Sequence, residues 1–95
     1  MMKSRVIWSN IVNEKLFSYQ NEHFSKEETH DYLINLVIET ENLLLNPILS
    51  KTYTEEYGMY AGVSRVVINK FRIYFEYVGD DVIILDINYP RENLL

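Results

Sequence analysis

The segment SRVVINKFRIYFEYVGDDVIILDIN, from Ser64 to Asn88, contains three apolar runs separated by two short polar interruptions. Runs rich in Val, Ile, Phe and Tyr and bounded by Asn, Asp or Gly are typical of β-strands joined by tight turns. A two-residue turn at Asn69-Lys70 would place Ile68 opposite Phe71. The segment therefore predicts a three-stranded antiparallel meander whose register follows from its turns.

The second interruption, Gly79-Asp80-Asp81, is expected to form a three-residue loop that places Val78 opposite Val82 and Phe75 opposite Leu85. One face of the meander then collects apolar side chains: Val66, Ile68, Phe71, Ile73, Phe75, Tyr77, Ile83, Leu85, Ile87 and Tyr89. The opposite face collects the polar side chains and three aliphatic ones: Arg65, Arg72, Tyr74, Glu76, Asp86, Asn88, Val67, Val82 and Ile84. Because a slip by one residue would bury a charge, we expect one defined register.

The N-terminal part predicts a strand followed by a helix. Residues 3–8 form a short β-prone run, and Ser9 or Asn10 can then cap a helix through a side-chain oxygen. Apolar side chains recur at helical spacing from Val12 onward, so this helix is expected over residues 10–22.

A second helix should begin at Lys26, because Ser25 and Glu28 form a capping box. Its apolar stripe continues to Asn46-Pro47, where the proline disfavours further helix. Residues 47–62 lose this period and predict a loop that carries three tyrosines.

The composition limits the class of protein. The 95 residues suit a single domain, 1–95, and 47% hydrophobic residues are typical of a globular protein. The sequence contains no cysteine and no apolar run long enough to cross a membrane, so we expect a cytoplasmic protein. No nucleotide-binding glycine motif occurs, and His23 and His30 have no third ligand at metal-binding spacing, so no cofactor or metal is expected.

The net charge of -5 argues against a generally basic nucleic-acid-binding protein. The first hairpin is an exception, since residues 57–75 contain Arg65, Lys70 and Arg72 and no acidic residue. This hairpin is where a polyanion or an acidic partner would bind.

Three stretches resemble the RelE/ParE superfamily of bacterial toxins (plasmid stabilisation proteins): VIWS at residues 6–9, SRVVINKFRIYFEYVGDDVIIL at residues 64–85, and YPREN at residues 89–93. The resemblance and the pattern together imply an α+β fold of order β-α-α-β-β-β. In this fold two N-terminal helices pack on one face of a small twisted antiparallel sheet.

The family implies the toxin component of a type II toxin-antitoxin module, with a cognate antitoxin as partner. One branch is ParE-like and inhibits growth by binding a protein such as DNA gyrase, which is the function expected here. An alternative is a RelE-like, ribosome-dependent mRNA endonuclease. A second alternative is a detoxified family member that acts as a binding module.

For the endonuclease alternative, the resemblance implies that Arg72, Arg65 and Arg91 handle phosphate, while Glu76 is the candidate general base on the same face. The other interpretation of Arg72 is a solvated strand arginine paired with Glu76. For antitoxin or target binding, the expected face consists of Arg65, Arg72, Tyr74, Ile84, Asp86 and Asn88.

Overall fold

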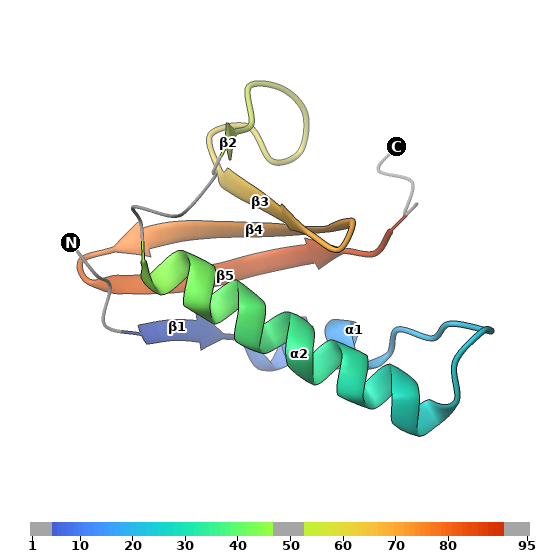
Figure 1. The fold of residues 1–95 in the computed structure, drawn as a ribbon. Helices are drawn as coiled ribbons and strands as arrows, with labels where there is room; N and C mark the ends of the chain where they lie inside the picture. The colour runs from blue at the N-terminus through green and yellow to red at the C-terminus, as the bar shows by residue number, and fades with distance from the viewer. Residues whose placement is uncertain (1–4, 47–52, 91–95) are drawn as a thin grey trace.

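The computed structural model describes residues 5–46 and 53–90, and its centre is the expected meander (Figure 1). Its strands are β3 (Ser64–Ile68), β4 (Phe71–Val78) and β5 (Asp81–Asn88). Asn69 and Lys70 have φ of 51° and 70°, the backbone of the two-residue turn that matches strand twist. Ile68 lies opposite Phe71, so the predicted register of the first hairpin is confirmed.

The second hairpin differs from the prediction over half its length. Its turn has two residues, Gly79 and Asp80, and Val78 therefore pairs with Asp81. The pairing shifts by one residue between Tyr74 and Phe75, where Leu85 is the extra residue of a β-bulge. The expected pairs then resume with Tyr74 opposite Asp86.

The bulge reverses which side chains of β5 enter the core. Val82 and Ile84 are buried, whereas Ile83 is half-buried and Leu85 is 41% exposed. The predicted faces of these four residues are therefore wrong. Four consecutive apolar residues fit either alternation, so hydrophobicity alone does not select one.

The sheet has five strands in the order β1-β5-β4-β3-β2 and is mixed. β1 (Arg5–Trp8) pairs with β5 in parallel, and β2 (Tyr53–Thr54) pairs with β3 in antiparallel fashion. The expected all-antiparallel sheet and the β-α-α-β-β-β order are thus corrected. β2 has only two residues, too few for an alternation to be seen in the sequence.

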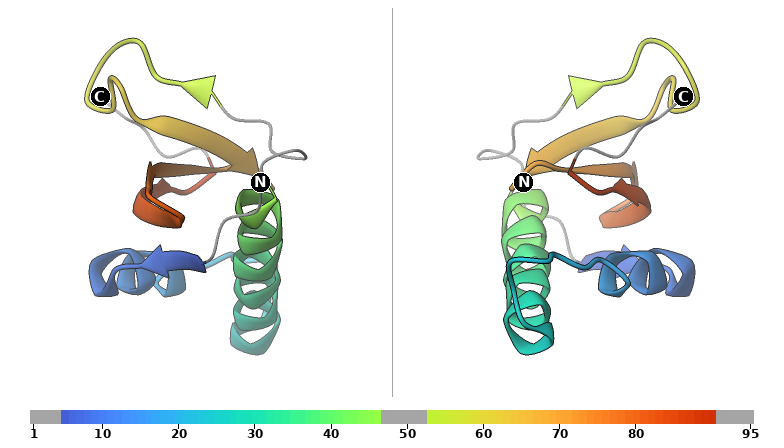
Figure 2. Two further views of the ribbon diagram at one scale, coloured as in Figure 1. Left: turned by 90° about the vertical axis from the view of Figure 1, so that its left-hand side faces the viewer. Right: turned by 90° about the vertical axis from the view of Figure 1, so that its right-hand side faces the viewer.

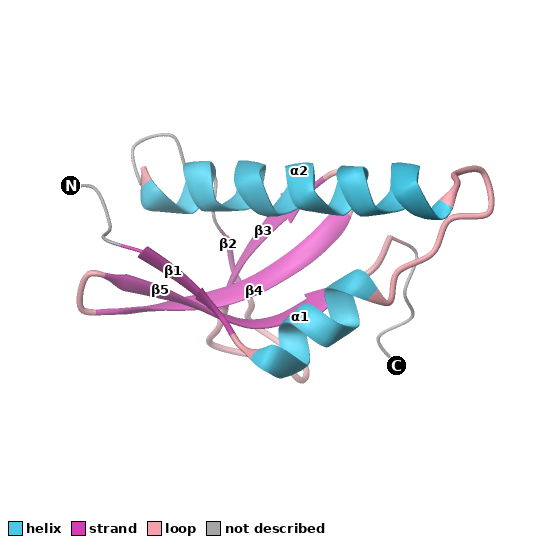
Figure 3. Ribbon diagram, turned by 90° about the horizontal axis from the view of Figure 1, so that it is seen from below, coloured by secondary structure: helices cyan, strands magenta, loops and turns pink. Residues whose placement is uncertain are grey.

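The sequence predicts that both helices pack on one face of the sheet, but in the structure they do not. α2 (Lys26–Leu45) crosses one face, whereas α1 (Asn10–Phe17) continues in line with β1 along the edge beside β5 (Figures 1 and 3). The turned views in Figure 2 separate the two helices clearly. The hydroxyl of Tyr89 donates to the carbonyl of Lys15, which ties the end of α1 to the chain after β5.

The capping predictions are confirmed. The Ser9 hydroxyl accepts the Val12 N–H at 3.2 Å, and Ser25 and Glu28 exchange bonds of 3.1 and 2.9 Å. α1 is shorter than the expected 10–22 helix. It ends where the Ser18 hydroxyl donates to the Glu14 carbonyl at 2.6 Å, so the side chain competes with continued helix.

The core lies between α2, the inner side of α1 and the sheet. It contains Val12, Leu16, Leu33, Leu36, Leu44, Val66, Ile68, Phe71, Ile73, Phe75, Val82, Ile84 and Ile87. Ile73, Phe75 and Ile87 therefore pack into the core as predicted, and Leu85 does not.

Candidate functional site

The face of the sheet opposite α2, called here the open face, carries the predicted binding residues. Strand pairing brings Arg65 beside Tyr74, Tyr74 beside Asp86, and Arg72 beside Asn88. Glu76 lies on the same face of β4, where it is exposed. Ile84 is 1% exposed in the core and does not belong to this face, because the bulge reverses its orientation.

A residue that was not predicted, Tyr60, covers the middle of the open face. Its ring stacks on Tyr74 with centroids 3.8 Å apart, and its hydroxyl donates to Asp86 Oδ2 at 2.5 Å. Tyr74 is consequently 1% exposed. The sequence does show three tyrosines in this loop. No local pattern indicates which of them folds back onto the sheet.

The loop that carries Tyr60 is closed by its own backbone. Glu55 donates to the Val63 carbonyl at 3.0 Å, and Gly62 donates back to the Glu55 carbonyl at 2.8 Å. A further bond of 3.0 Å joins the Val63 N–H to the Tyr60 carbonyl. Gly62 has φ of 85°, a backbone conformation that most side chains disfavour.

Asp86 is surrounded by donors. Besides Tyr60, the N–H of Ile87 donates to Asp86 Oδ1 at 2.8 Å, and Lys15 Nζ lies 3.6 Å from the same oxygen. Lys15 Nζ also donates to Asn88 Oδ1 at 3.2 Å. A residue of α1 thus helps to hold the open face in place.

Burial and the hydrogen bond with Asp86 raise the pKa of Tyr60 to about 12, although the Asn88 amide opposes the shift. The phenol is therefore neutral at physiological pH and acts as a hydrogen-bond donor. This arrangement favours a structural role for the Tyr60–Asp86 pair over proton transfer near pH 7.

Arg65, Arg72 and Glu76, the expected catalytic residues, lie on the open face but differ in their surroundings. Arg65 forms an ion pair with Glu55 at 3.0 Å, and its guanidinium lies 4.8 Å from the Tyr53 ring centre. Arg72 and Glu76 are four residues apart on β4, which corresponds to about 13 Å between their Cα atoms at the usual rise of a strand. Arg91 lies outside the described residues.

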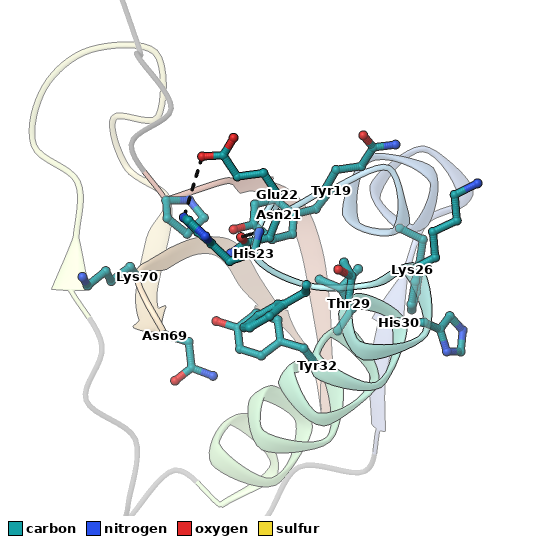
Figure 4. Close-up of a pocket in the computed structure, with 15 residues that line it drawn as sticks. Tyr19, Asn21, Glu22, His23, Lys26, Thr29, His30, Tyr32, Asn69 and Lys70 are labelled. Atoms are coloured by element: carbon teal, nitrogen blue, oxygen red, sulfur yellow. Dashed lines mark hydrogen bonds and ion pairs between the residues drawn. The ribbon is translucent and has the colours of Figure 1, made fainter.

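A separate pocket of about 1190 Å³ lies between the α1–α2 connection, the first turns of α2 and the β3–β4 turn (Figure 4). Aromatic, amide and basic side chains line it: Phe17, Tyr19, Gln20, Asn21, His23, Phe24, Lys26, His30, Tyr32, Asn69 and Lys70, with Glu22 as the one carboxylate. We call it the turn pocket. His23 and His30 are both exposed.

Two further classes of site, metal centres and membrane spans, are absent from residues 5–46 and 53–90. No group of three or more His, Asp or Glu side chains is placed to hold a metal ion in these ranges. The helices in the same ranges include none that is long and apolar enough to cross a membrane. Comparison with family models, curated proteins and solved structures finds no match to this chain.

Proposed function

We propose that the chain is the toxin component of a type II toxin-antitoxin module, of the ParE-like kind that binds a protein target such as DNA gyrase. The proposal starts from the resemblance of residues 6–9, 64–85 and 89–93 to RelE/ParE toxins. The open face then supports protein binding over RNA cleavage.

The observation that carries this choice is the state of Arg65. Its guanidinium is occupied by Glu55 at 3.0 Å, so contact with a phosphate would require that ion pair to break. Cleavage through a 2′-hydroxyl also needs a base close to the scissile phosphate. The candidate base Glu76 is four residues from Arg72 along β4, about 13 Å between their Cα atoms, so the backbone does not set these two side chains next to each other.

The accessible part of the open face suits an amphipathic segment of an antitoxin. Val67 is 55% exposed, and it lies beside Arg72 and two residues from Arg65. Tyr53 pairs with Arg65 across the β2–β3 ladder and is also exposed. An acidic, partly apolar segment would cover Val67 and Tyr53 while its carboxylates pair with Arg72.

Regulated expression in bacteria followed by pulse labelling tests the proposal. Filamentation with a DNA-damage response, and continued protein synthesis, is the expected result. A rapid stop in protein synthesis would instead indicate an mRNA endonuclease, and normal growth would indicate a binding module without toxicity.

Co-purification with the product of the neighbouring gene tests the binding face. Val67→Glu should weaken association at least tenfold, because it places a charge in the apolar part of the contact. Val78→Glu is the matched control, since Val78 is 54% exposed at the far end of β4. Equal affinities for the two variants would exclude the part of the open face around Val67 as the contact site.

A further inference from the structure

The turn pocket combines aromatic surface with positive charge. Tyr19 and Tyr32 both contact the ring of Phe71, with centroids 5.0 and 6.3 Å apart, so the two tyrosine rings form a fixed wall. Phe24 packs on Tyr32 at 5.9 Å and extends that wall. Flat rings of this kind offer faces on which a planar ligand can stack.

The charge of the pocket is opposite to that of the chain. Its lining includes two lysines, Lys26 and Lys70, and two histidines, His23 and His30, whereas only Glu22 is acidic. The whole chain has a net charge of -5. Glu27 and Glu28, in the first turn of α2, are not among the lining residues. The lining itself therefore holds more basic than acidic side chains, which favours an anion over a cation as the ligand.

Figure 4 places Lys70 and His23 on one side of the pocket and Lys26 and His30 on the other, with the two tyrosines between them. His23 Nε2 lies 3.7 Å from Glu22 Oε1, and both side chains are largely exposed. An exposed pair of this kind is weak, so an incoming anion can replace Glu22 as the partner of His23.

The walls of the pocket are formed before any ligand binds. Asn69 and Lys70 occupy a tight turn with positive φ, which fixes where the Lys70 side chain starts. On the facing wall, Asn21 Oδ1 accepts the His23 N–H at 2.9 Å, and the Asn21 carbonyl accepts the Phe24 N–H at 3.0 Å. A site of this kind loses little ordering entropy on binding.

We propose that the turn pocket binds a small anion that carries a flat ring, of the size of a mononucleotide. The ring lies against Tyr19, Tyr32 and Phe24, and the anionic group lies between Lys70 and His23. The volume of about 1190 Å³ is ample, since typical ligand pockets have roughly 300 to 1,000 Å³. This inference does not depend on toxin activity, because the pocket does not include the open-face residues.

NMR titrations of the full chain with AMP, ribose 5-phosphate and adenosine measure how much the ring and the anionic group each contribute to affinity. AMP should bind best. Ribose 5-phosphate lacks the ring and should bind at least about fivefold more weakly, from the usual worth of base stacking on aromatic side chains. Adenosine lacks the anion and should also bind more weakly. A parallel titration with indole-3-acetate decides whether the ligand is a nucleotide or an aromatic acid.

Three variants then place the ligand. Lys70→Gln should weaken AMP binding about tenfold, since it removes a charge-assisted hydrogen bond. Arg5→Gln is the matched control, because it removes the same charge from an exposed pair with Asp81 and does not line the pocket. Glu22→Gln should strengthen binding up to about fivefold, because it removes the competing carboxylate.

The proposal is overturned if neither AMP nor indole-3-acetate binds at millimolar concentration. It is also overturned if AMP and ribose 5-phosphate bind equally, or if Lys70→Gln and Arg5→Gln have the same affinity for AMP.

Discussion

The ring of Tyr60 lies flat on the ring of Tyr74, with centroids 3.8 Å apart and an interplanar angle of 9°. One ring comes from the loop before β3 and the other from the middle of β4. This contact buries part of the face that the sequence had indicated for partner binding. The outer part of that face, around Val67 and Tyr53, is what a partner can reach.

Tyr60→Phe is expected to lower the free energy of unfolding by about 1 to 3 kcal/mol, because Asp86 loses a donor in a partly buried place. The stacked ring is kept in this variant, so chemical denaturation measures the hydroxyl alone. Asp86→Asn in the same background completes a double-mutant cycle. A coupling free energy near zero would show that the hydrogen bond of 2.5 Å does not stabilise the fold.

Alkaline pH should lower the free energy of unfolding of the wild-type protein, because Tyr60 loses its proton. Burial, followed by the bond with Asp86, raises the pKa of Tyr60 from 10.0 to about 12, so the folded state holds this proton more tightly than the unfolded state. The stabilisation is complete below pH 10 and is lost as the pH rises toward 12. Thermal denaturation between these values should show a steeper decline for the wild type than for Tyr60→Phe. If the two proteins lost stability in parallel, the raised pKa of Tyr60 would not be the cause of the decline.

Phe75→Ala and Leu85→Ala should differ strongly in stability, although the sequence placed both residues in the core. Phe75 is fully buried and its truncation should cost about 3 to 5 kcal/mol. Leu85 is 41% exposed at the bulge and its truncation should cost less than about 1.5 kcal/mol. Urea denaturation of the two variants checks this, and equal losses would place Leu85 in the core after all.

Ser25→Ala should destabilise the protein by about 1 kcal/mol, because the Glu28 N–H loses its cap at the start of α2. Ser25→Thr keeps the hydroxyl and should retain most of the stability. The bonds from the Ser25 backbone and side chain lower the pKa of Glu28, so the capping box stabilises above the unfolded pKa and weakens in acid. Denaturation of both variants at neutral and acidic pH measures the effect.

The sequence was a good guide where a short local pattern decides the structure. Asn69-Lys70 determined the first turn and its register, and Ser25 with Glu28 determined where α2 begins. In each case a few neighbouring residues satisfy their own backbone groups, so the result does not depend on distant parts of the chain.

The remaining features depend on contacts between distant residues. The bulge at Leu85 follows from which of four apolar residues the core accepts, and the run VIIL contains no polar residue to mark it. Tyr60 covers the open face because Tyr74 and Asp86 are placed to receive it. The turn pocket likewise joins side chains from the α1–α2 connection and the β3–β4 turn, which no spacing in the sequence brings together.

The parallel pairing of β1 with β5 has a consequence for the order of folding. Arg5 and Asp81, which pair in register and form an ion pair of 3.2 Å, are 76 residues apart in the chain. Closing so long a loop is slow compared with forming the meander hairpins, so β1 should join the sheet late. During synthesis the apolar sides of α1 and α2 have no sheet to pack against until β5 has been made. A chain that ends at residue 62 should therefore remain unfolded, and its circular dichroism and amide exchange would show whether it does.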